Sequence, residues 1–192
     1  HADQPLLSGL YYLDRALAPF AEVRTGTISS LLNRELSVLA LSDIGKIVGP
    51  DAARLAQWVT DGGVLLRFAG SRMAQDSDDL LPARLRPGER TLGGAMAWTD
   101  PARLAPFPEI SPFFGLKIPD DVRIKRQVLA EPTLDIGEKT WARLEDGTPL
   151  VTGDRYGSGW IVLYHTTANT EWSNLPLSGL FVEMLQAIVR LS

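Results

Sequence analysis

The segment from residue 55 to residue 71 constrains the fold more strongly than any other part of this chain. Apolar side chains recur at helical spacing up to Val59, and Gly62 and Gly63 can end a helix in a left-handed cap. The apolar run that follows, 64–69, has the length of a buried strand. Ligands of open α/β sheets meet the carboxyl ends of the strands, so we expect any functional site to lie near Ala69. The methyl group of Ala69 argues against covalent catalysis at that position.

The first half of the chain has the pattern of a parallel sheet with helices on both faces. We expect a first helix that carries Leu6, Leu10, Leu13 and Leu17, strands over 20–24 and 36–41, a helix over 49–62 and a strand over 64–69. Pro50 stands in the first turn of the second helix, where proline is favoured. These elements predict an α/β fold of three layers, with a parallel sheet between the helices.

The second half is predicted to be richer in β structure, after an irregular insertion over about 75–119. Prolines punctuate that insertion and exclude long elements, and we expect a short strand over 92–98 and packing through Phe107, Phe113 and Phe114. Further strands are expected over 122–130 and 140–144, and a hairpin of 149–152 and 160–165 around the glycine-rich stretch 153–159. A last helix, capped by Asn174, carries an apolar stripe from Leu177 to Leu191.

Composition excludes several classes of function. The 192 residues, 45% of them hydrophobic, fit one globular domain over 1–192, and the net charge of −4 gives no general attraction to nucleic acid. The absence of cysteine removes thiol nucleophiles and thiolate metal sites, and two histidines cannot form a histidine metal cluster. We therefore expect no metal, no cofactor and no nucleic-acid partner. No apolar stretch approaches the ~20 residues of a membrane helix, so this fragment is not expected to span a membrane.

The remaining charged clusters are interpreted as solvated surface. The basic group comprises Arg84, Arg86, Arg90, Arg123, Lys125 and Arg126, and it lacks the interleaved aromatic residues of a single-strand binder. The acidic pairs Asp78-Asp79 and Asp120-Asp121 lack the spacing of a metal loop.

The arrangement around residues 55–71 resembles the class I glutamine amidotransferase-like fold, and this resemblance implies a three-layer, flavodoxin-like sheet. In that family a helix passes through Gly-Gly into a strand, a sharp turn presents a cysteine, and a late strand ends in a histidine followed two residues later by a glutamate. Here Gly62 and Gly63 match in kind, but Ala69 stands in place of the cysteine. His165 ends the late strand, and Thr167 stands in place of the glutamate. The resemblance therefore implies a site that has lost its nucleophile and cannot hydrolyse glutamine by the family's mechanism.

Three stretches also resemble the amidotransferase-like middle region of bacterial aerotolerance-type proteins with paired transmembrane helices. They are Gly-Leu-Tyr-Tyr-Leu-Asp-Arg-Ala-Leu-Ala-Pro-Phe over 9–20, Trp-Val-Thr-Asp-Gly-Gly-Val-Leu-Leu-Arg-Phe-Ala-Gly over 58–70 and Trp-Ser-Asn-Leu-Pro-Leu-Ser-Gly-Leu-Phe over 172–181. This likeness implies a non-catalytic domain of an inner-membrane protein that faces the periplasm. The start at His1 without an initiator methionine favours the same interpretation, namely a domain of a longer polypeptide. The expected partners are other domains of that polypeptide or other envelope proteins.

One set of residues could still form a nucleophile, a base and an orienting acid, namely Ser71, His165 and Asp43, if the strand ends converge. The sequence around Ser71 lacks the Gly-x-Ser-x-Gly elbow that exposes a catalytic serine, which disfavours this triad. Arg67 lies inside an apolar strand and needs a partner, for which Asp43 is the natural candidate. We favour a structural ion pair there over an anion-binding pocket.

A residual cleft at the strand ends is the place where we expect a small ligand or a peptide to bind. Its predicted lining is Asp43, Arg67, Ala69, Ser71, Arg72, His165 and Trp172. The favoured function is a non-catalytic binding or assembly module of a bacterial envelope protein. The alternatives are a serine-type hydrolase that uses Ser71 and His165, and a purely structural spacer whose cleft is filled by the chain's own side chains.

Overall fold

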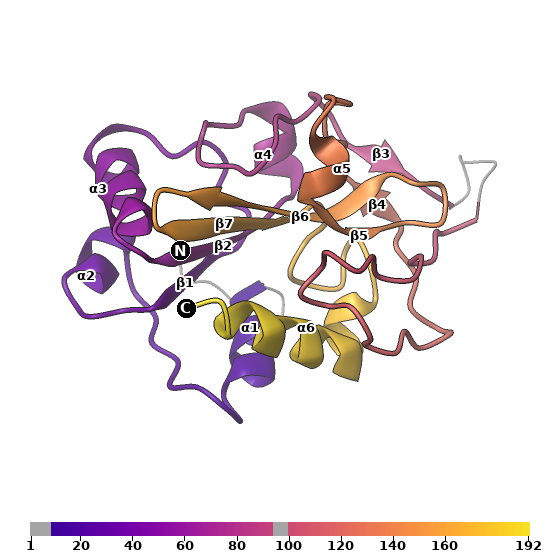
Figure 1. The fold of residues 1–192 in the computed structure, drawn as a ribbon, viewed down its shortest axis with the longest axis horizontal. Helices are drawn as coiled ribbons and strands as arrows, with labels where there is room; N and C mark the ends of the chain where they lie inside the picture. The colour runs from indigo at the N-terminus through magenta and orange to yellow at the C-terminus, as the bar shows by residue number, and fades with distance from the viewer. Residues whose placement is uncertain (1–8, 94–99) are drawn as a thin grey trace.

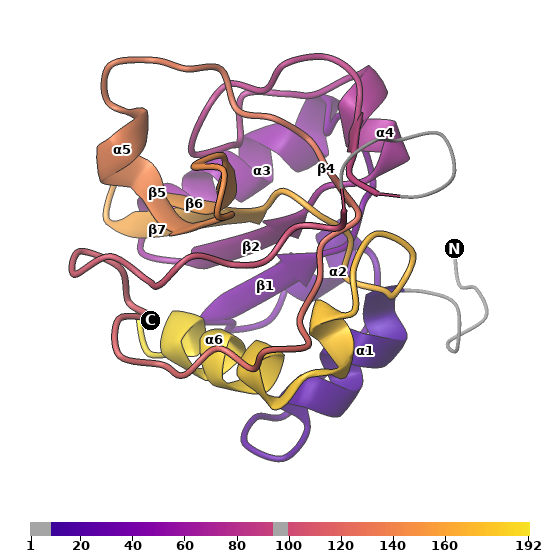
Figure 2. The same cartoon turned by 90° about the vertical axis from the view of Figure 1, so that its right-hand side faces the viewer.

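The structure, a computed structural model, describes residues 9–93 and 100–192. It is a three-layer α/β fold in which a five-stranded mixed sheet lies between two layers of helices (Figures 1 and 2). The helices are α1 (Gly9–Leu17), α2 (Ile28–Leu32), α3 (Gly49–Thr60), α4 (Ser71–Gln75), α5 (Ile136–Lys139) and α6 (Gly179–Val189). The strands are β1 (Val38–Leu41), β2 (Val64–Phe68), β3 (Arg90–Thr91), β4 (Arg126–Gln127), β5 (Thr140–Arg143), β6 (Pro149–Tyr156) and β7 (Gly159–Tyr164). The predicted fold class is confirmed.

The main sheet has the strand order β1-β2-β7-β6-β5. β1, β2 and β7 are parallel, whereas β6 and β5 are antiparallel to their neighbours. The parallel part of the sheet is therefore limited to β1, β2 and β7. β6 is antiparallel to β7 because the two strands are joined by a hairpin, which connects antiparallel strands. A separate two-stranded ribbon is formed by β3 and β4.

The two faces of the sheet have separate apolar cores. On one face α1 and α6 pack against β2 and β7, through a cluster that includes Phe68, Tyr164 and Phe181. On the other face α3 packs through Leu55 and Val59, which are fully buried. Figure 2 shows α3 on one side of the sheet and α1 with α6 on the other. All five residues of β2 are buried, as its continuous apolar run predicts for a strand covered on both faces.

The hairpin β6-β7 turns at Gly157 and Ser158, later than the glycine-rich sequence suggests. β6 continues through Gly153, and the ring of Trp141 lies where a Cβ at this residue would stand, so glycine is needed there for close packing and not for a turn. Gly157 has a φ of 62°, the left-handed conformation that glycine adopts without strain. The predicted hairpin is confirmed, with a shorter turn.

The stretch between α4 and α5 contains only short regular segments among the described residues, in line with its proline content. Phe107 and Phe113 are buried and join the core on the α6 face, as expected. Phe114, which was also expected to pack there, is 58% exposed. Part of the strand predicted over 92–98 lies outside the described residues, and the regular pairing in this region is β3 with β4.

Other sequence predictions need correction. Residues 20–24, predicted as a strand, form no strand, because no neighbouring strand within the described part of the chain pairs with them. The strand predicted over 122–130 is reduced to β4 and isolated bridges. The last helix begins at Gly179 after a short 3-10 turn, Leu175–Leu177, and is capped by the Ser178 hydroxyl instead of Asn174. Leu177 therefore lies outside the apolar stripe and is 67% exposed.

Candidate functional site

The carboxyl ends of the three parallel strands lie side by side, as expected for the predicted site. Asp43 follows β1, Ser71 follows β2 and His165 follows β7. The structure brings Asp43 and Ser71 to the same helix end but gives His165 different neighbours. The partners of these side chains decide what this edge of the sheet can do.

Asp43 caps the amino end of α4. Its Oδ2 accepts a hydrogen bond from the backbone N–H of Arg72 at 2.8 Å, and its Oδ1 accepts one from that of Met73 at 2.9 Å. Two donors of the first helical turn are thereby satisfied, and the negative charge lies at the positive end of the helix. A Cβ at Gly70 would collide with the Asp43 carboxylate, so glycine is required there for this close approach. The position that an anionic ligand could occupy is filled by the chain's own carboxylate.

Ser71 is exposed, and its Oγ lies 3.4 Å from Oε2 of Glu89. Within the described residues, the three members of the considered triad make no hydrogen bond to one another. Asp43 binds backbone amides, Ser71 faces Glu89, and His165 is bound elsewhere. The geometry needed for a serine nucleophile, in which the hydroxyl lies against an imidazole nitrogen, is not assembled.

His165 is fully buried and both ring nitrogens are hydrogen-bonded. Nδ1 lies 2.9 Å from the carbonyl oxygen of Val128, and Nε2 lies 2.9 Å from Oγ1 of Thr152. A carbonyl can only accept, so Nδ1 carries the proton and Nε2 accepts from the threonine hydroxyl. Burial lowers the pKa of His165 to about 4, although the hydrogen bond to Val128 opposes the shift. The ring is a neutral link between β7, β6 and the segment that leads out of β4.

This buried histidine makes the fold sensitive to moderately acidic pH. The folded-state pKa of about 4 lies below the ordinary 6.5, so below pH 6.5 the unfolded chain binds a proton that the folded chain does not. Stability therefore falls as the pH drops from 6.5 towards 4, by up to about 3 kcal/mol at about 1.4 kcal/mol per pKa unit. Urea denaturation between pH 7 and pH 5 measures the slope. His165→Gln should remove this component, and an unchanged slope in that variant would contradict the assignment.

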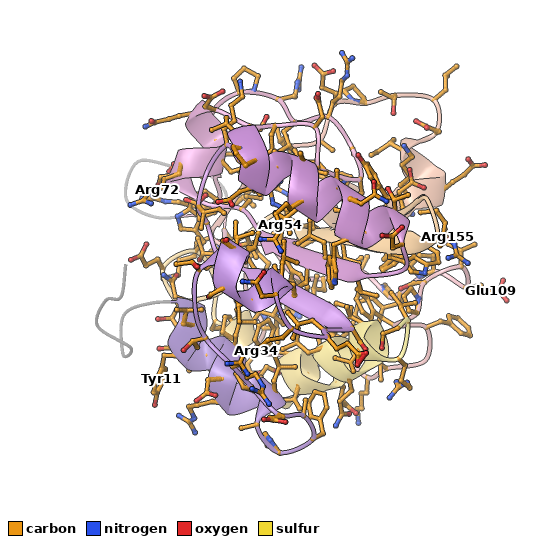
Figure 3. All side chains as sticks on the ribbon, turned by 90° about the vertical axis from the view of Figure 1, so that its left-hand side faces the viewer. Tyr11, Arg34, Arg54, Arg72, Glu109 and Arg155 are labelled. Carbon is orange, nitrogen blue, oxygen red and sulfur yellow. The ribbon has the colours of Figure 1, made fainter. Side chains whose placement is uncertain are left out.

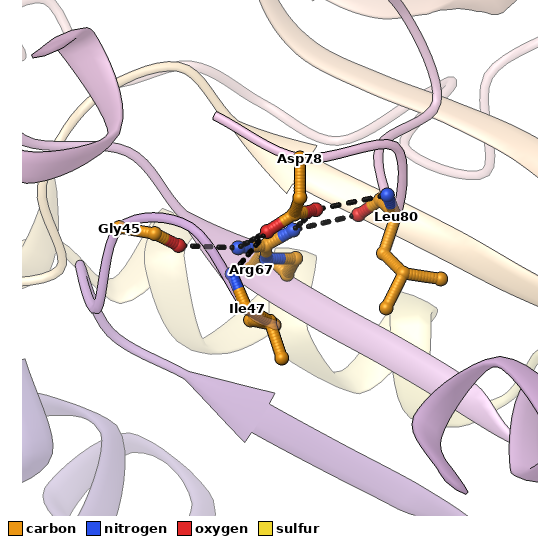
Figure 4. Close-up of polar contacts among 5 residues, drawn as sticks. All are labelled: Gly45, Ile47, Arg67, Asp78 and Leu80. Atoms are coloured by element: carbon orange, nitrogen blue, oxygen red, sulfur yellow. Dashed lines mark hydrogen bonds and ion pairs between the residues drawn. The ribbon is translucent and has the colours of Figure 1, made fainter. Parts of the chain in front are cut away.

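Arg67 lies inside β2 with 1% of its side chain exposed, and its partner is Asp78 (Figure 4). The guanidinium binds the Asp78 carboxylate through two hydrogen bonds of 2.7 and 3.1 Å. It also donates to the carbonyl oxygens of Leu80 at 2.8 Å and Gly45 at 3.0 Å. The predicted structural ion pair is present, but the predicted partner, Asp43, is wrong because that carboxylate is engaged at α4.

Asp78 does more than neutralise Arg67. Its Oδ2 also accepts the backbone N–H of Ile47 at 2.7 Å, and its Oδ1 accepts that of Leu80 at 2.9 Å. One carboxylate thus joins β2, the loop after β1 and the loop after α4, as Figure 4 shows. The sequence pattern predicts solvated surface for Asp78, and no local signal distinguishes it from the exposed Asp79.

Trp172 and Ala69 belong to one buried cluster. Trp172 is 2% exposed and packs with Ala69, Met73 and Leu163 at the strand ends. The backbone carbonyl of Trp172 accepts hydrogen bonds from the amides that precede and begin β4, at 2.7 and 3.1 Å. The ring therefore lies in the buried cluster at the strand ends. The space above Ala69 is therefore occupied by the protein's own side chains.

Two cavities lie away from this region. A groove of about 580 Å³ runs along β1, and α1, residues 21–25 and residues 37–40 are among the segments that line it. A hollow of about 410 Å³ lies near Trp141 and Trp160, beside the β6-β7 hairpin. Neither is lined by a residue of the predicted cleft. Ligand binding at the predicted cleft stays a prediction.

In the described residues, no group of three or more histidine, aspartate or glutamate side chains is placed to hold a metal ion. Nor does any helix in the same residues combine the length and apolar character needed to cross a membrane.

No protein-family model matches this chain, and no curated protein matches it in sequence. Solved structures match it in fold. The cytoplasmic protein STM1381 from Salmonella typhimurium LT2 has a TM-score of 0.68 at 14% identity, over 95% of this chain and 86% of that one. The cytoplasmic protein STM3548 from Salmonella typhimurium gives 0.66 at 14% identity, with the same coverage.

A cold-adapted β-galactosidase from Rahnella sp. R3 also contains a similar fold. The TM-score is 0.66 at 15% identity, and the match covers 96% of this chain but 27% of that enzyme. At such identities these similarities show the fold alone.

Proposed function

We propose that this chain is a non-catalytic, amidotransferase-like module that acts by binding or assembly. The observation that carries the proposal is that each of the strand-end side chains is bound or covered by another group of the protein. Asp43 caps a helix, His165 is buried between Thr152 and Val128, and Trp172 covers Ala69. A site arranged in this way has no serine hydroxyl hydrogen-bonded to an imidazole base.

The location of the module is part of the proposal and rests on the sequence resemblance. The three stretches that resemble the aerotolerance-type membrane proteins support a place in a bacterial envelope protein, facing the periplasm. The expected partners are then neighbouring domains of the same polypeptide or other envelope proteins. Expression of the parent protein with a reporter fused after this domain tests the side of the membrane on which it lies.

A purely structural spacer is the second candidate. The filled space above Ala69 favours it, because a spacer needs packed strand ends and no opening. Saturable binding of a partner distinguishes the module from the spacer, since a spacer is not expected to bind a partner with a measurable dissociation constant.

Ser71→Ala tests whether the chain is an enzyme. We expect wild type and variant to hydrolyse a panel of p-nitrophenyl esters at the same background rate, because within residues 9–93 and 100–192 no imidazole lies beside the Ser71 hydroxyl. The substitution is at an exposed side chain, so the free energy of unfolding should change by less than about 0.5 kcal/mol.

A loss of turnover in Ser71→Ala, with the stability unchanged, would contradict the proposal and support the serine hydrolase. His165→Gln would then have to abolish the same activity, because a nucleophile and its base act as one unit.

A further inference from the structure

β1 is an edge strand of the main sheet. β1 stands at the end of the strand order, and the strand that pairs with it in the described residues is β2. An uncovered edge exposes a row of backbone donors and acceptors that can pair with another extended chain. The groove described above runs along this edge, and Figure 3 looks at the molecule from this side.

The backbone of β1 offers unpaired groups to the groove. The N–H of Val64 donates to the carbonyl of Ser37 at 3.0 Å, and Val38 lies opposite Val64 in the parallel register. In a parallel ladder alternate residues direct their backbone groups to the same neighbour, so those of Val38 and Ala40 point away from β2. In the part of the chain that the structure describes, no backbone hydrogen bond joins these two residues to a further strand.

The groove has apolar walls on both faces of the sheet. On the α6 face, Leu13 and Leu17 of α1 line it, and they belong to the same core as Val38 and Ala40. On the α3 face it is lined by Leu31, which packs against the opposite core. A chain that extended the sheet beyond β1 would thus meet apolar side chains above and below, as a buried parallel strand does.

The charges around the groove nearly cancel. Three acidic residues and two arginines line it, namely Asp14, Glu22, Glu35, Arg24 and Arg34. Glu22 and Arg24 form an ion pair of 2.7 Å, which leaves two acids and one arginine. Figure 3 shows Arg34 on this side, near α1. A strongly charged occupant has no complement here, so charge favours an uncharged one.

We propose that the groove binds an uncharged, apolar peptide segment of a partner polypeptide, which adds as a strand to β1. This inference rests on the proposed binding function and assigns its site and the chemistry of its partner. The added strand exchanges backbone hydrogen bonds with Val38 and Ala40, and its side chains point to the two apolar walls. Backbone pairing provides the affinity, and the walls select for apolar residues.

The test is an array of neutral hexapeptides built from Val, Ile, Leu, Phe and Thr, screened against the whole 192-residue chain. Binding members are titrated by NMR, and the expected result is saturable shifts centred on the amides of Val38 and Ala40, with slowed hydrogen exchange at both. The same peptides, N-methylated at alternate residues, should not bind, because they lack the donors of one strand edge. Failure of every peptide to perturb the β1 amides would overturn the inference.

Ala40→Pro tests the site from the protein side. Proline removes the N–H of residue 40 that points away from β2, and it leaves the pairing of β1 with β2 intact. Edge strands tolerate proline at positions of this kind. We expect affinity to fall about tenfold, from the loss of one hydrogen bond and an unpaired acceptor on the peptide. Ala40→Val keeps the N–H and is the matched control, which should bind as wild type does. Equal affinity in the proline variant would refute strand addition at β1.

Two further outcomes identify other occupants. A concentration-dependent dimer that Ala40→Pro disrupts would assign the edge to a second copy and overturn the proposal. Pairing of residues 21–25 with β1, seen as protection of those amides without peptide, would assign the edge to the chain itself and overturn it too. Neither outcome affects the proposed non-catalytic function, which fails only through Ser71-dependent turnover or through the absence of any saturable partner.

Discussion

Replacing Asp78 by alanine is expected to lower the free energy of unfolding by about 3–5 kcal/mol, the usual cost of removing one partner of a buried ion pair. Arg67 would keep its bonds to the carbonyls of Leu80 and Gly45, but its charge would be uncompensated. The backbone amides of Ile47 and Leu80 would also lose their acceptor. Urea denaturation followed by circular dichroism measures the change. A loss of this size is a large part of the ordinary stability of a domain, about 5–15 kcal/mol.

The neighbouring acid provides the matched control. Asp79→Ala removes an exposed carboxylate of the same type and should change stability by less than about 0.5 kcal/mol. The double variant Arg67→Met with Asp78→Leu removes both charges, and it should recover much of the loss because the cost lies in the unpaired charge. Equal effects of Asp78→Ala and Asp79→Ala would show that the network does not hold the loops together.

Gly159→Ala is expected to cost about 3 kcal/mol or more, at the upper end of the range for overpacking. A Cβ at this residue would collide with the backbone carbonyls of Gly63 and Val59, where α3 turns into β2. Backbone atoms cannot move aside as the end of a flexible side chain can. The helix end, β2 and the start of β7 would have to separate, so we expect a lower denaturation midpoint in urea and disturbed amide signals at the amino ends of both strands.

Gly137→Ala is the control for this prediction. Gly137 lies in α5, where an added Cβ would meet no atom within 4 Å, and its φ is not positive. Alanine there should be neutral or stabilising by up to about 1 kcal/mol, the helix propensity difference between the two residues. A similar loss of stability in both variants would contradict this prediction. It would mean that the cost of Gly159→Ala comes from losing the flexibility of glycine and not from the close approach of α3 to β7.

The sequence predicted those elements whose residues interact with near neighbours in the chain. Periodicity, caps and turn residues predict the helix over 49–62, which ends two residues earlier in the structure, the buried strand after Gly63 and the β6-β7 hairpin. The segment 20–24 shows the limit of such reasoning. Its composition suits a strand, but composition does not decide whether another strand pairs with it, and in the described residues β1 and this segment do not pair.

The candidate site shows the same limit in its side chains. Sequence reasoning identified Arg67 as a residue that needs a buried partner, since an unpaired guanidinium inside a strand is too costly. It could not choose between Asp43 and Asp78, because both carboxylates lie in loops and the choice depends on how those loops fold over the strand ends.

The sequence by itself determined the class of fold, the lack of a thiol nucleophile and the need for a partner at Arg67. Only the tertiary structure decided that Asp78 is that partner, that His165 is bound by Thr152 and Val128, and that β1 lies at the edge of the sheet that the described residues form. The physical reason is the range of the interactions. Periodicity and capping depend on residues that are close together in the sequence. Ion pairs, buried hydrogen bonds and strand pairing join residues that are distant in the chain and meet only when it is folded.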